Sequence, residues 1–198
     1  MKSFLANRNG RAIRFNEDAV RPMGRTATGV RGMTLDEDGE DEVIGMICVN
    51  DLEKETILVV SEQGYGKRSV VDDYRKTNRG GKGVKTLNIT DKTGKVVAIR
   101  SVTDEHDLMI INKSGITIRL KMTDISVIGR ATQGVRLINL EKRNDTISSV
   151  CQVPTEEEEE FVEGEEGAVD AEGAEKNAEN AENVSEAPAA EENENSEE

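Results

Sequence analysis

A motif that recurs three times constrains this chain more than any other feature of its sequence. The copies begin at Gly10, Gly64 and Gly115, which lie 54 and 51 residues apart. Counted from these glycines, matching residues recur at equal offsets without a gap: Arg14, Arg68 and Arg119; Arg25, Arg79 and Arg130; Gly29, Gly83 and Gly134; Val30, Val84 and Val135; Arg31, Lys85 and Arg136. Such self-similarity indicates one structural unit built three times. Because the shared residues are apolar residues and cations, each unit is predicted to form a scaffold that also presents positive charge.

Each copy is predicted to form four short strands. The expected first strands are residues 3–7, 57–61 and 108–112, and the expected fourth strands are residues 43–49, 96–102 and 147–153. A turn at the glycine leads into the second strand, and Val30, Met33 and Leu35 mark the third strand of the first copy. Four strands in about fifty residues are typical of a propeller blade. The predicted fold is all-β, and three blades suggest the carboxy-terminal part of a longer array, because propellers close with roughly four to eight.

The charges divide the chain into two unlike regions. Residues 1–153 hold 25 Lys and Arg against 21 Asp and Glu, whereas residues 154–198 hold 19 acidic residues and one lysine. The first region is long enough to bury a core of its own. The second has almost nothing apolar to offset the entropy of ordering, so it is predicted to be a disordered acidic tail. The expected organisation is a domain of residues 1–153, with repeats at about 1–50, 51–104 and 105–153, followed by the tail at 154–198.

The repeated cations predict a surface that binds nucleic acid. Ile13 and Phe15 flank Arg14, so period-two alternation is expected to turn the arginine away from the apolar face. Cations spaced regularly along a rim are typical of proteins that bind the DNA backbone. Because no recognition helix is predicted, binding should not depend on base sequence. The candidate DNA-binding residues are Arg14, Arg25, Arg31, Lys67, Arg68, Arg79, Lys82, Lys85, Arg119, Arg130 and Arg136; the competing interpretation is a set of solvated surface cations.

Other functional signals are weak. His106 is the only histidine and lies in an acidic loop, and no nucleophile and base stand at related positions, so no catalytic residue is assigned. No metal-ligating pattern is found; residues 36–42 place Gly39 fourth where a calcium loop requires a glycine at the sixth position. Cys48 and Cys151 are expected to be buried, reduced thiols. No apolar run approaches eighteen residues, so neither secretion nor membrane insertion is predicted.

Three segments carry a resemblance to a known family. Residues 20–32, 63–68 and 125–135 closely resemble the last blades of the carboxy-terminal domain found in the A subunit of bacterial DNA gyrase. The resemblance covers roughly residues 1–153. It implies a β-pinwheel, in which propeller-like blades exchange a strand with their neighbours and a basic rim wraps double-stranded DNA.

The resemblance also implies a cellular role. Wrapping would serve ATP-dependent negative supercoiling by a complex with the gyrase amino-terminal A domain and the B subunit, in the cytoplasm at the nucleoid. ATP and magnesium would be used by the complete complex, and no cofactor is expected in this chain.

Two departures from the family pattern limit these expectations. Residues 77–83 keep the last five residues of the family's signature heptapeptide but lack its leading Gln and Arg. This segment is therefore expected to help hold DNA without supplying the decisive wrap. The family's catalytic tyrosine belongs to an amino-terminal domain absent from this sequence, and neither Tyr65 nor Tyr74 has its context. The chain alone is expected to be inactive in DNA cleavage.

Three alternatives remain open on the sequence alone. The chain could be the corresponding domain of the A-type subunit of topoisomerase IV, a propeller-like protein-interaction module, or an enzyme with a site assembled between blades. The tail adds a regulatory hypothesis, in which its net charge of −18 competes with DNA for the cations of a domain with a net charge of +4. A merely solubilising tail is the competing interpretation.

Overall fold

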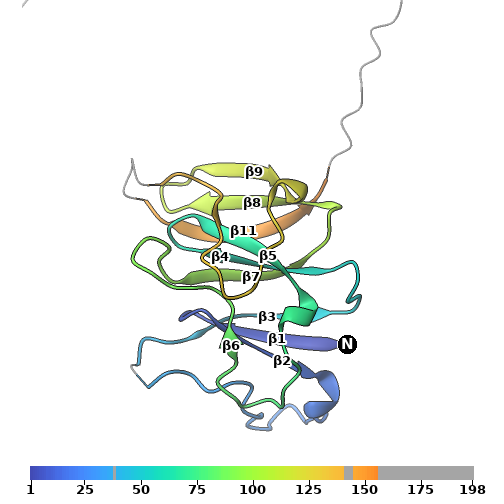
Figure 1. The fold of residues 1–198 in the computed structure, drawn as a ribbon. Coiled ribbons are helices and arrows are strands. Elements are labelled where there is room, and N and C mark those ends of the chain that lie inside the picture. The colour runs from blue at the N-terminus through green and yellow to red at the C-terminus, as the bar shows by residue number, and fades with distance from the viewer. Residues whose placement is uncertain (38, 141–144, 156–198) are drawn as a thin grey trace, which may run out of the picture. The chain divides into compact units, whose positions relative to one another are not determined.

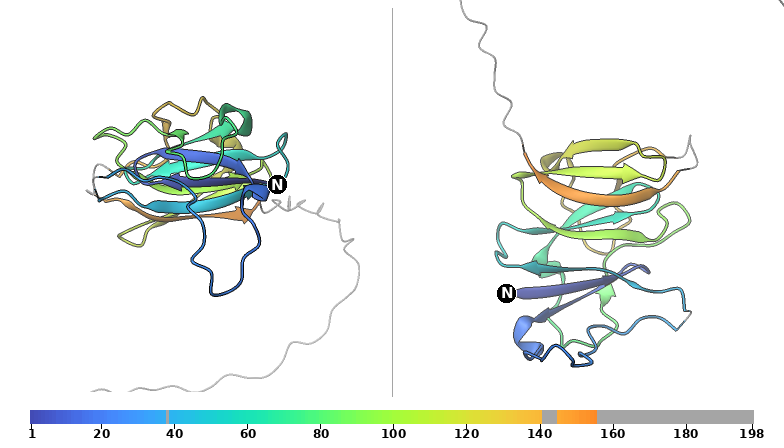
Figure 2. Two further views of the ribbon diagram at one scale, coloured as in Figure 1. Left: turned by 90° about the horizontal axis from the view of Figure 1, so that it is seen from below. Right: turned by 180° about the vertical axis from the view of Figure 1, so that it is seen from behind.

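The described chain is a stack of three antiparallel β-sheets. The computed structural model describes residues 1–37, 39–140 and 145–155. The sheets follow the order of the repeats from one end of the stack to the other, as two opposite views show (Figures 1 and 2). The all-β, propeller-like fold expected from the repeat is confirmed.

The strands divide among the sheets as follows. The first sheet has the order β3 (Val43–Val49), β1 (Lys2–Asn7), β2 (Arg11–Asn16), β6 (Val84–Lys85). The second has the order β10 (Val135–Arg136), β5 (Tyr65–Val70), β4 (Thr56–Ser61), β7 (Val96–Val102). The third has the order β11 (Ile147–Pro154), β8 (His106–Asn112), β9 (Thr117–Lys121). Short 3-10 helices follow the second strand of each repeat: η1 (Glu17–Ala19), η2 (Val71–Asp73) and η3 (Met122–Asp124).

The third strand of a repeat leaves its own sheet. β6 belongs to the second repeat but pairs with β2 of the first, with Val84 opposite Ala12. In the same way, β10 of the third repeat pairs with β5 of the second, with Val135 opposite Gly66. The exchange of strands implied by the family resemblance is therefore present. The structure corrects one detail of the expected repeat: its third strand completes the preceding sheet, and residues 30–35, predicted as the third strand of the first copy, are not in a strand.

The two glycines of the motif are the contact points of this exchange. Gly10 has φ +77°, and a Cβ there would come within 2.8 Å of the Leu87 carbonyl oxygen. Gly83 has φ +76°, and a Cβ there would come within 2.5 Å of the Ala12 carbonyl oxygen. Both positions need a left-handed backbone and the absence of a side chain, so glycine is required twice. Equivalent contacts join the second and third repeats through Gly64, Ile138, Gly134 and Gly66.

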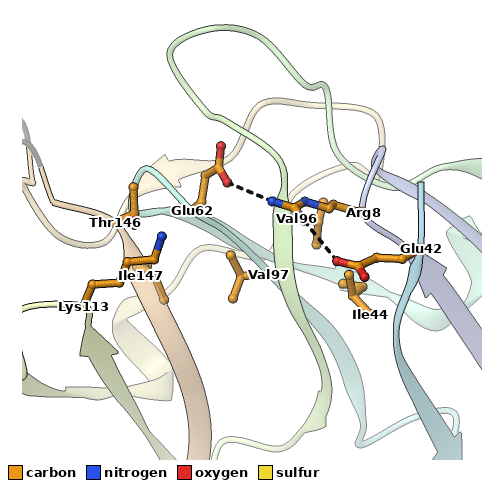
Figure 3. A pocket seen from close by; sticks show the side chains of 9 residues that line it. All are labelled: Arg8, Glu42, Ile44, Glu62, Val96, Val97, Lys113, Thr146 and Ile147. Carbon is orange, nitrogen blue, oxygen red and sulfur yellow. Dashed lines mark hydrogen bonds and ion pairs between the residues drawn. The ribbon is translucent and has the colours of Figure 1, made fainter. Parts of the chain in front are cut away.

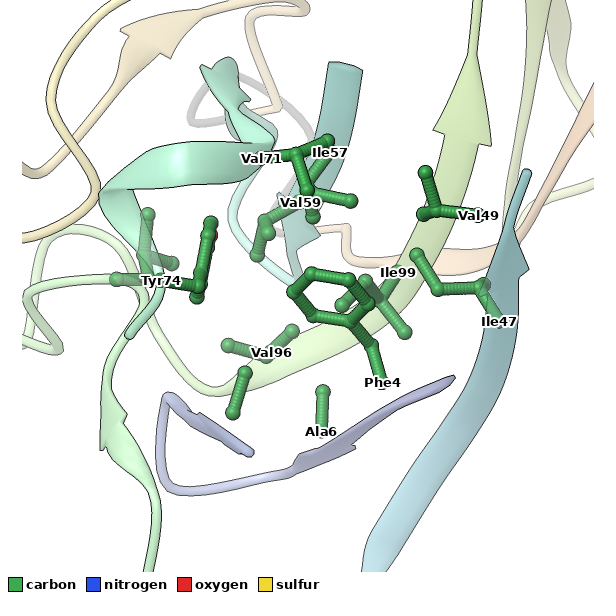
Figure 4. Packing of buried hydrophobic residues seen from close by; sticks show 12 residues of the cluster. Phe4, Ala6, Ile47, Val49, Ile57, Val59, Val71, Tyr74, Val96 and Ile99 are labelled. Atoms are coloured by element: carbon green, nitrogen blue, oxygen red, sulfur yellow. The ribbon is translucent and has the colours of Figure 1, made fainter. Parts of the chain in front are cut away.

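Apolar side chains fill the spaces between successive sheets. Between the first and second sheets, the rings of Phe4 and Tyr74 meet edge to face with centroids 5.4 Å apart (Figure 4). A second cluster, built around Leu58, Leu108 and Ile110, fills the space between the second and third sheets. Because the middle sheet is covered on both faces, five of the six residues of β4 are buried, and the strand is a nearly continuous apolar run.

Successive repeats also meet through the turn that precedes the motif glycine. The backbone N–H of Val96 donates to the Arg8 carbonyl (3.0 Å), and that of Ile147 donates to the Glu62 carbonyl (2.9 Å). The Arg8 guanidinium lies 3.0 Å from the carboxylate of Glu42 and 4.0 Å from that of Glu62, beside a cavity of about 210 Å³ that all three repeats line (Figure 3). The repeats are thus joined by the exchanged strand and by this turn.

Two further sequence-based expectations concern the two cysteines and the end of the domain. Cys48 is half-buried and Cys151 is exposed, both as free thiols, so their predicted burial was wrong. Each lies on a strand of an end sheet rather than of the middle one. β11 runs to Pro154, one residue beyond the predicted domain boundary, and the tail from residue 156 lies outside the described residues.

Candidate nucleic-acid interface

The eleven candidate cations fall into three groups by exposure. Three are buried, two are half-buried and six are exposed. The buried residues are Arg14, Lys67 and Arg68; the half-buried residues are Arg79 and Arg130; the exposed residues are Arg25, Arg31, Lys82, Lys85, Arg119 and Arg136. The fold therefore does not bring all of them to one solvated surface.

Arg14 is a buried structural residue. Its Nη1 donates to the carbonyls of Val71 (2.9 Å) and Tyr74 (3.0 Å), and its guanidinium lies 5.9 Å from the ring centroid of Phe4. It also lies 3.3 Å from the exposed carboxylate of Asp72. The expectation that Arg14 points into solvent was wrong. The connection of the second repeat runs beside β2, with a parallel bridge at Arg14, and covers this side of the strand.

Arg68 and Arg119 stand at the same offset as Arg14 and show the effect of the connection that covers it. Arg68 is buried in the same way, with its backbone bridged to Val127 and its guanidinium paired with the carboxylate of Asp104. Its predicted solvent exposure was likewise wrong. Arg119 stands at the same offset in the third repeat, where no later repeat of the described chain covers β9. Its side chain is 34% exposed and donates to Asp107 (2.7 Å) and to the Pro154 carbonyl (3.1 Å).

Lys67 is fully buried and holds the connection of the third repeat. Its Nζ donates to the carbonyl of Gly129 (2.7 Å), to the hydroxyl of Thr132 (3.1 Å) and to the carbonyl of Arg130. Burial lowers the pKa of the Lys67 ammonium to about 8; the positive charge of Arg130 adds to this effect, and the carboxylate of Asp73 opposes it. Lys67 therefore ties two repeats together; it was predicted to bind DNA, and the structure buries its side chain.

Arg79 and Arg130 hold the preceding repeat by its backbone. Arg79 Nε donates to the carbonyl of Ala19 at the end of η1 (2.9 Å), and its Nη1 donates to the carbonyl of Arg31 (3.2 Å). Arg130 repeats both contacts one repeat later, with the carbonyls of Asp73 at 2.8 Å and Lys85 at 2.7 Å. These guanidinium groups are half-buried and keep further donors, so they fix the connection and add positive charge beside it.

The six exposed cations lie mainly on the connections and the exchanged strands. Lys82 precedes β6, Lys85 lies within it, and Arg136 lies within β10. Gly81 precedes Lys82 and is exposed, so the backbone beside this lysine is open to close approach, which suits a large anion, whereas Gly83 is packed against Ala12. The arrangement can attract a polyanion. The helices of the described residues are single 3-10 turns, so none can enter a major groove and read base edges.

Sequence offsets missed some exposed cations of the same connections. Arg21 and Arg75 share one offset and are exposed, but the third repeat has Ser126 at that position. Lys76 is exposed and stands where the other copies have Pro22 and Val127. Their offsets do not carry a cation in all three copies, and they lie outside the glycine-containing segments that brought in Lys67 and Lys82. Their position in the segment after η1 or η2 would have included them.

The described ranges hold no group of side chains arranged for another kind of chemistry. No group of three or more His, Cys, Asp or Glu side chains there is arranged to hold a metal ion. The His106 ring lies 2.8 Å from the Thr103 hydroxyl. The Tyr74 hydroxyl is buried against that of Thr86, and burial raises the pKa of Tyr74. Among helices of residues 1–37, 39–140 and 145–155, none has the length and apolar character needed to cross a bilayer.

Comparison with known proteins places these features in a family. The family model described as DNA gyrase C-terminal domain, beta-propeller, matches three times, over residues 4–50, 55–103 and 106–151. The DNA gyrase A subunit of Staphylococcus aureus (strain NCTC 8325 / PS 47) is 52% identical over 153 residues, covering 77% of this chain and 17% of that protein. The same protein from strain MRSA252 is 52% identical over 148 residues, covering 75% of this chain and 16% of the relative. The chain thus spans about a sixth of the length of these relatives.

Solved structures share the fold. A solved DNA gyrase A C-terminal domain superposes with a TM-score of 0.68 at 29% identity, covering 76% of this chain and 50% of that one. The C-terminal domain of DNA topoisomerase IV superposes with a TM-score of 0.71 at 24% identity, covering 77% and 46%. At that identity the second likeness shows the fold alone.

A substitution separates the structural cations from the solvated ones. Arg14→Met keeps the aliphatic stem but leaves the buried carbonyls of Val71 and Tyr74 without their donor. We expect the free energy of unfolding to fall by about 3 kcal/mol, because unsatisfied buried polar groups cost about 1–3 kcal/mol each. Arg25→Met replaces an exposed arginine and is the control, with an expected change within about 0.5 kcal/mol. Urea unfolding of both variants measures the difference, and equal stabilities would contradict a structural role for Arg14.

The lowered pKa of Lys67 predicts a dependence of stability on pH. Between pH 8 and about 10.5 the unfolded chain holds the Lys67 proton more tightly than the folded chain, so the free energy of unfolding should rise with pH. Below and above this window the contribution is constant. Wild type should therefore gain stability relative to Lys67→Met across the window, measured by urea unfolding at each pH. Lys82→Met is the control for an exposed lysine; a flat difference for both variants would show that Lys67 titrates normally.

Proposed function

The chain belongs to the DNA gyrase C-terminal domain family, and from this premise we propose that residues 1–155 bind and wrap double-stranded DNA independently of base sequence. The observation that carries the proposal is the set of six exposed cations on the connections, on the exchanged strands and at Arg119. Three cations predicted to bind DNA are used inside the protein, so the contacts rest on the remaining ones. Arg79 and Arg130 support them by fixing the connections.

The energetics of wrapping set the number of contacts needed. Bending duplex DNA by 40–90° over a short site costs on the order of 1–6 kcal/mol, and a wrapped path requires several such bends. Cations that neutralise phosphates offset this cost through the release of counterions. Six engaged cations predict that log K falls with log salt concentration with a slope near −5, because each contact contributes about −0.9.

The proposed activity extends to the larger protein. We propose that wrapping by this domain serves the ATP-dependent supercoiling of a gyrase complex, together with the amino-terminal part of the A subunit and the B subunit. ATP and magnesium would be used elsewhere in that complex. DNA cleavage is assigned to no residue of this chain, because Tyr74 is enclosed in the core and Tyr65 lies under the ammonium of Lys92.

Two alternatives differ in observable ways. The solved topoisomerase IV domain shares the fold, but the 52% identity to gyrase A subunits favours the gyrase assignment. A protein-interaction module of the same fold would use its outer faces, and its cations would give no salt-dependent affinity for DNA. A salt titration therefore separates DNA binding from a purely protein-binding role.

The exposed cations of the second repeat provide the main test. Lys82→Ala combined with Lys85→Ala should weaken binding to duplexes of unrelated sequence equally and flatten the salt slope from about −5.4 to about −3.6. The charge-matched control is Lys54→Glu, which also lowers the net charge by two but lies in an exposed turn outside the connections. Fluorescence anisotropy across a salt series measures both. Equal flattening by Lys54→Glu would contradict a defined DNA path.

The acidic tail predicts a second effect on affinity. Its net charge of −18 follows β11 directly in the sequence, so it can compete with DNA for the same cations. Truncation after Thr155 leaves β11 complete and should raise DNA affinity at low salt, with the gain vanishing at high salt as the charges are screened. Unchanged affinity at low salt would instead indicate a solubilising tail.

A further inference from the structure

The middle repeat differs from the first beside the repeated arginine. Three residues after the motif glycine stand Ile13 in the first repeat and Lys67 in the second. Both side chains are buried, with 1% and 0% exposure, and both meet the connection of the next repeat. A lysine thus stands where the preceding sheet has an isoleucine, so the two connections are held by different interactions.

The residues that meet these two side chains differ in the same sense. Gly81 and Thr132 each stand seventeen residues after the motif glycine of their own repeat. A Cβ built on Gly81 would lie 3.5 Å from Cδ1 of Ile13, whereas the hydroxyl of Thr132 accepts a hydrogen bond from Nζ of Lys67 (3.1 Å). An isoleucine over a glycine in one sheet corresponds to a lysine bonded to a hydroxyl in the next. The buried ammonium therefore has a polar partner exactly where the first sheet has no side chain.

The acceptors of Lys67 all belong to one turn, residues 129–132. The carbonyls of Gly129 (2.7 Å) and Arg130 and the hydroxyl of Thr132 each accept a hydrogen bond from Nζ. The Thr132 hydroxyl donates in its turn to the carbonyl of Gly129 (2.8 Å). An ammonium has three donors, and these three bonds use all of them. Lys67 therefore fixes the shape of this turn as well as its place on the second sheet.

The same turn holds the exchanged strand of the second repeat. Arg130 donates to the carbonyls of Asp73 (2.8 Å), at the end of η2, and of Lys85 (2.7 Å), within β6. Just after β6, the N–H of Asn88 donates to the carbonyl of the last residue of the turn (3.1 Å). Lys85 is one of the exposed cations proposed to bind phosphate. A continuous chain of hydrogen bonds thus runs from the buried Lys67 through Arg130 to the backbone of Lys85.

The neighbouring exposed lysine, Lys82, is held by the first repeat. The carbonyl of Gly81 accepts from a backbone N–H of that repeat (3.0 Å), and a Cβ on Gly83 would meet the carbonyl oxygen of Ala12 at 2.5 Å. These contacts fix the backbone on both sides of Lys82. The carbonyl of Lys85, by contrast, is bound by the third repeat. The two lysines therefore provide an internal comparison, because only one of them is reached by the turn that Lys67 holds.

Resting on the DNA binding proposed above, we propose that Lys67 is a positioning residue for that binding. Its ammonium holds the turn 129–132, the turn places Arg130, and Arg130 fixes the backbone from which Lys85 reaches a phosphate. Lys67 itself touches no DNA, because its side chain is fully buried. Without the ammonium the turn loses three hydrogen bonds, so ordering Lys85 on the duplex costs more entropy. DNA affinity thus depends on a lysine that the duplex cannot reach.

A double-mutant cycle on DNA affinity tests this chain of contacts. Lys67→Met keeps the length of the side chain and removes the three donors; it is combined with Lys85→Ala and, separately, with Lys82→Ala. Ile13→Met is the matched control, because it changes the equivalent place of the first sheet and removes no donor. Circular dichroism and urea unfolding show whether each variant is folded. Thr132→Val, which removes one of the three acceptors, replaces Lys67→Met in the cycle if that variant does not fold.

Fluorescence anisotropy of a labelled duplex at pH 7 gives the readout. At about 100 mM salt, Lys67→Met should weaken binding about fivefold and flatten the salt slope from about −5.4 to about −4.5, as the loss of one phosphate contact would. Lys85→Ala should weaken binding about eightfold, and the double variant about tenfold rather than by the product of about fortyfold, because both changes remove the same contact. With Lys82→Ala the two effects should multiply, and Ile13→Met should bind as wild type does.

The outcomes separate this inference from the proposed function. A merely structural role for Lys67 would weaken binding without a selective coupling to Lys85. Effects that multiply in both cycles, or an unchanged affinity of folded Lys67→Met, would therefore overturn the inference while DNA binding stands. A wild-type chain without salt-dependent affinity, or one that Lys82→Ala does not weaken, would overturn the proposed function and the inference with it.

Discussion

The exchange of a two-residue strand between successive repeats is the constraint on which the rest of the structure depends. It requires a glycine on each side, because the two backbones approach too closely for a Cβ at Gly10 or Gly83. It also carries the connection of one repeat across the preceding sheet, where it covers Arg14 and supplies the carbonyls that the guanidinium binds. The burial of Arg14 and Arg68 follows from this path, and Arg119, which no later repeat of the described chain covers, stays exposed.

Positive charge has two uses in this fold. Arg14, Arg68 and Lys67 pack under the next repeat, where Arg14 and Lys67 satisfy its backbone carbonyls, and their charge is used inside the protein. Arg79 and Arg130 serve both uses: they bind backbone carbonyls inside the protein, and their half-exposed guanidinium groups also present charge to solvent. The side chains of Lys82 and Lys85 are exposed to solvent, although both belong to the same repeated motif. A count of Lys and Arg therefore overestimates the charge that can act on DNA.

Much of the fold could be predicted from particular residues, and the side-chain directions could not. The ranges 43–49 and 96–102 coincide with β3 and β7, because apolar β-branched runs between polar turns define strands well. Period-two alternation correctly places Ile13 and Arg14 on opposite faces of β2, but it does not show that either face meets water. The connection of the second repeat covers the Arg14 face, so the face opposite Ile13 is also interior. The pairing of Val84 with β2 could not be predicted either, because a strand of two residues shows no periodic pattern in the sequence.

The exchange also bears on the order in which the chain can become structured during synthesis. The first sheet begins with Lys2, but its outer strand is supplied by Val84 and Lys85. The chain must therefore leave the ribosome as far as Lys85 before the first sheet is complete, and by then β4 and β5 of the next sheet are already available. Each of the first two sheets is finished only by residues made during assembly of its successor. The growing chain consequently carries an incomplete sheet edge at its newest end, and the folding of each unit is timed by the translation of the one after it.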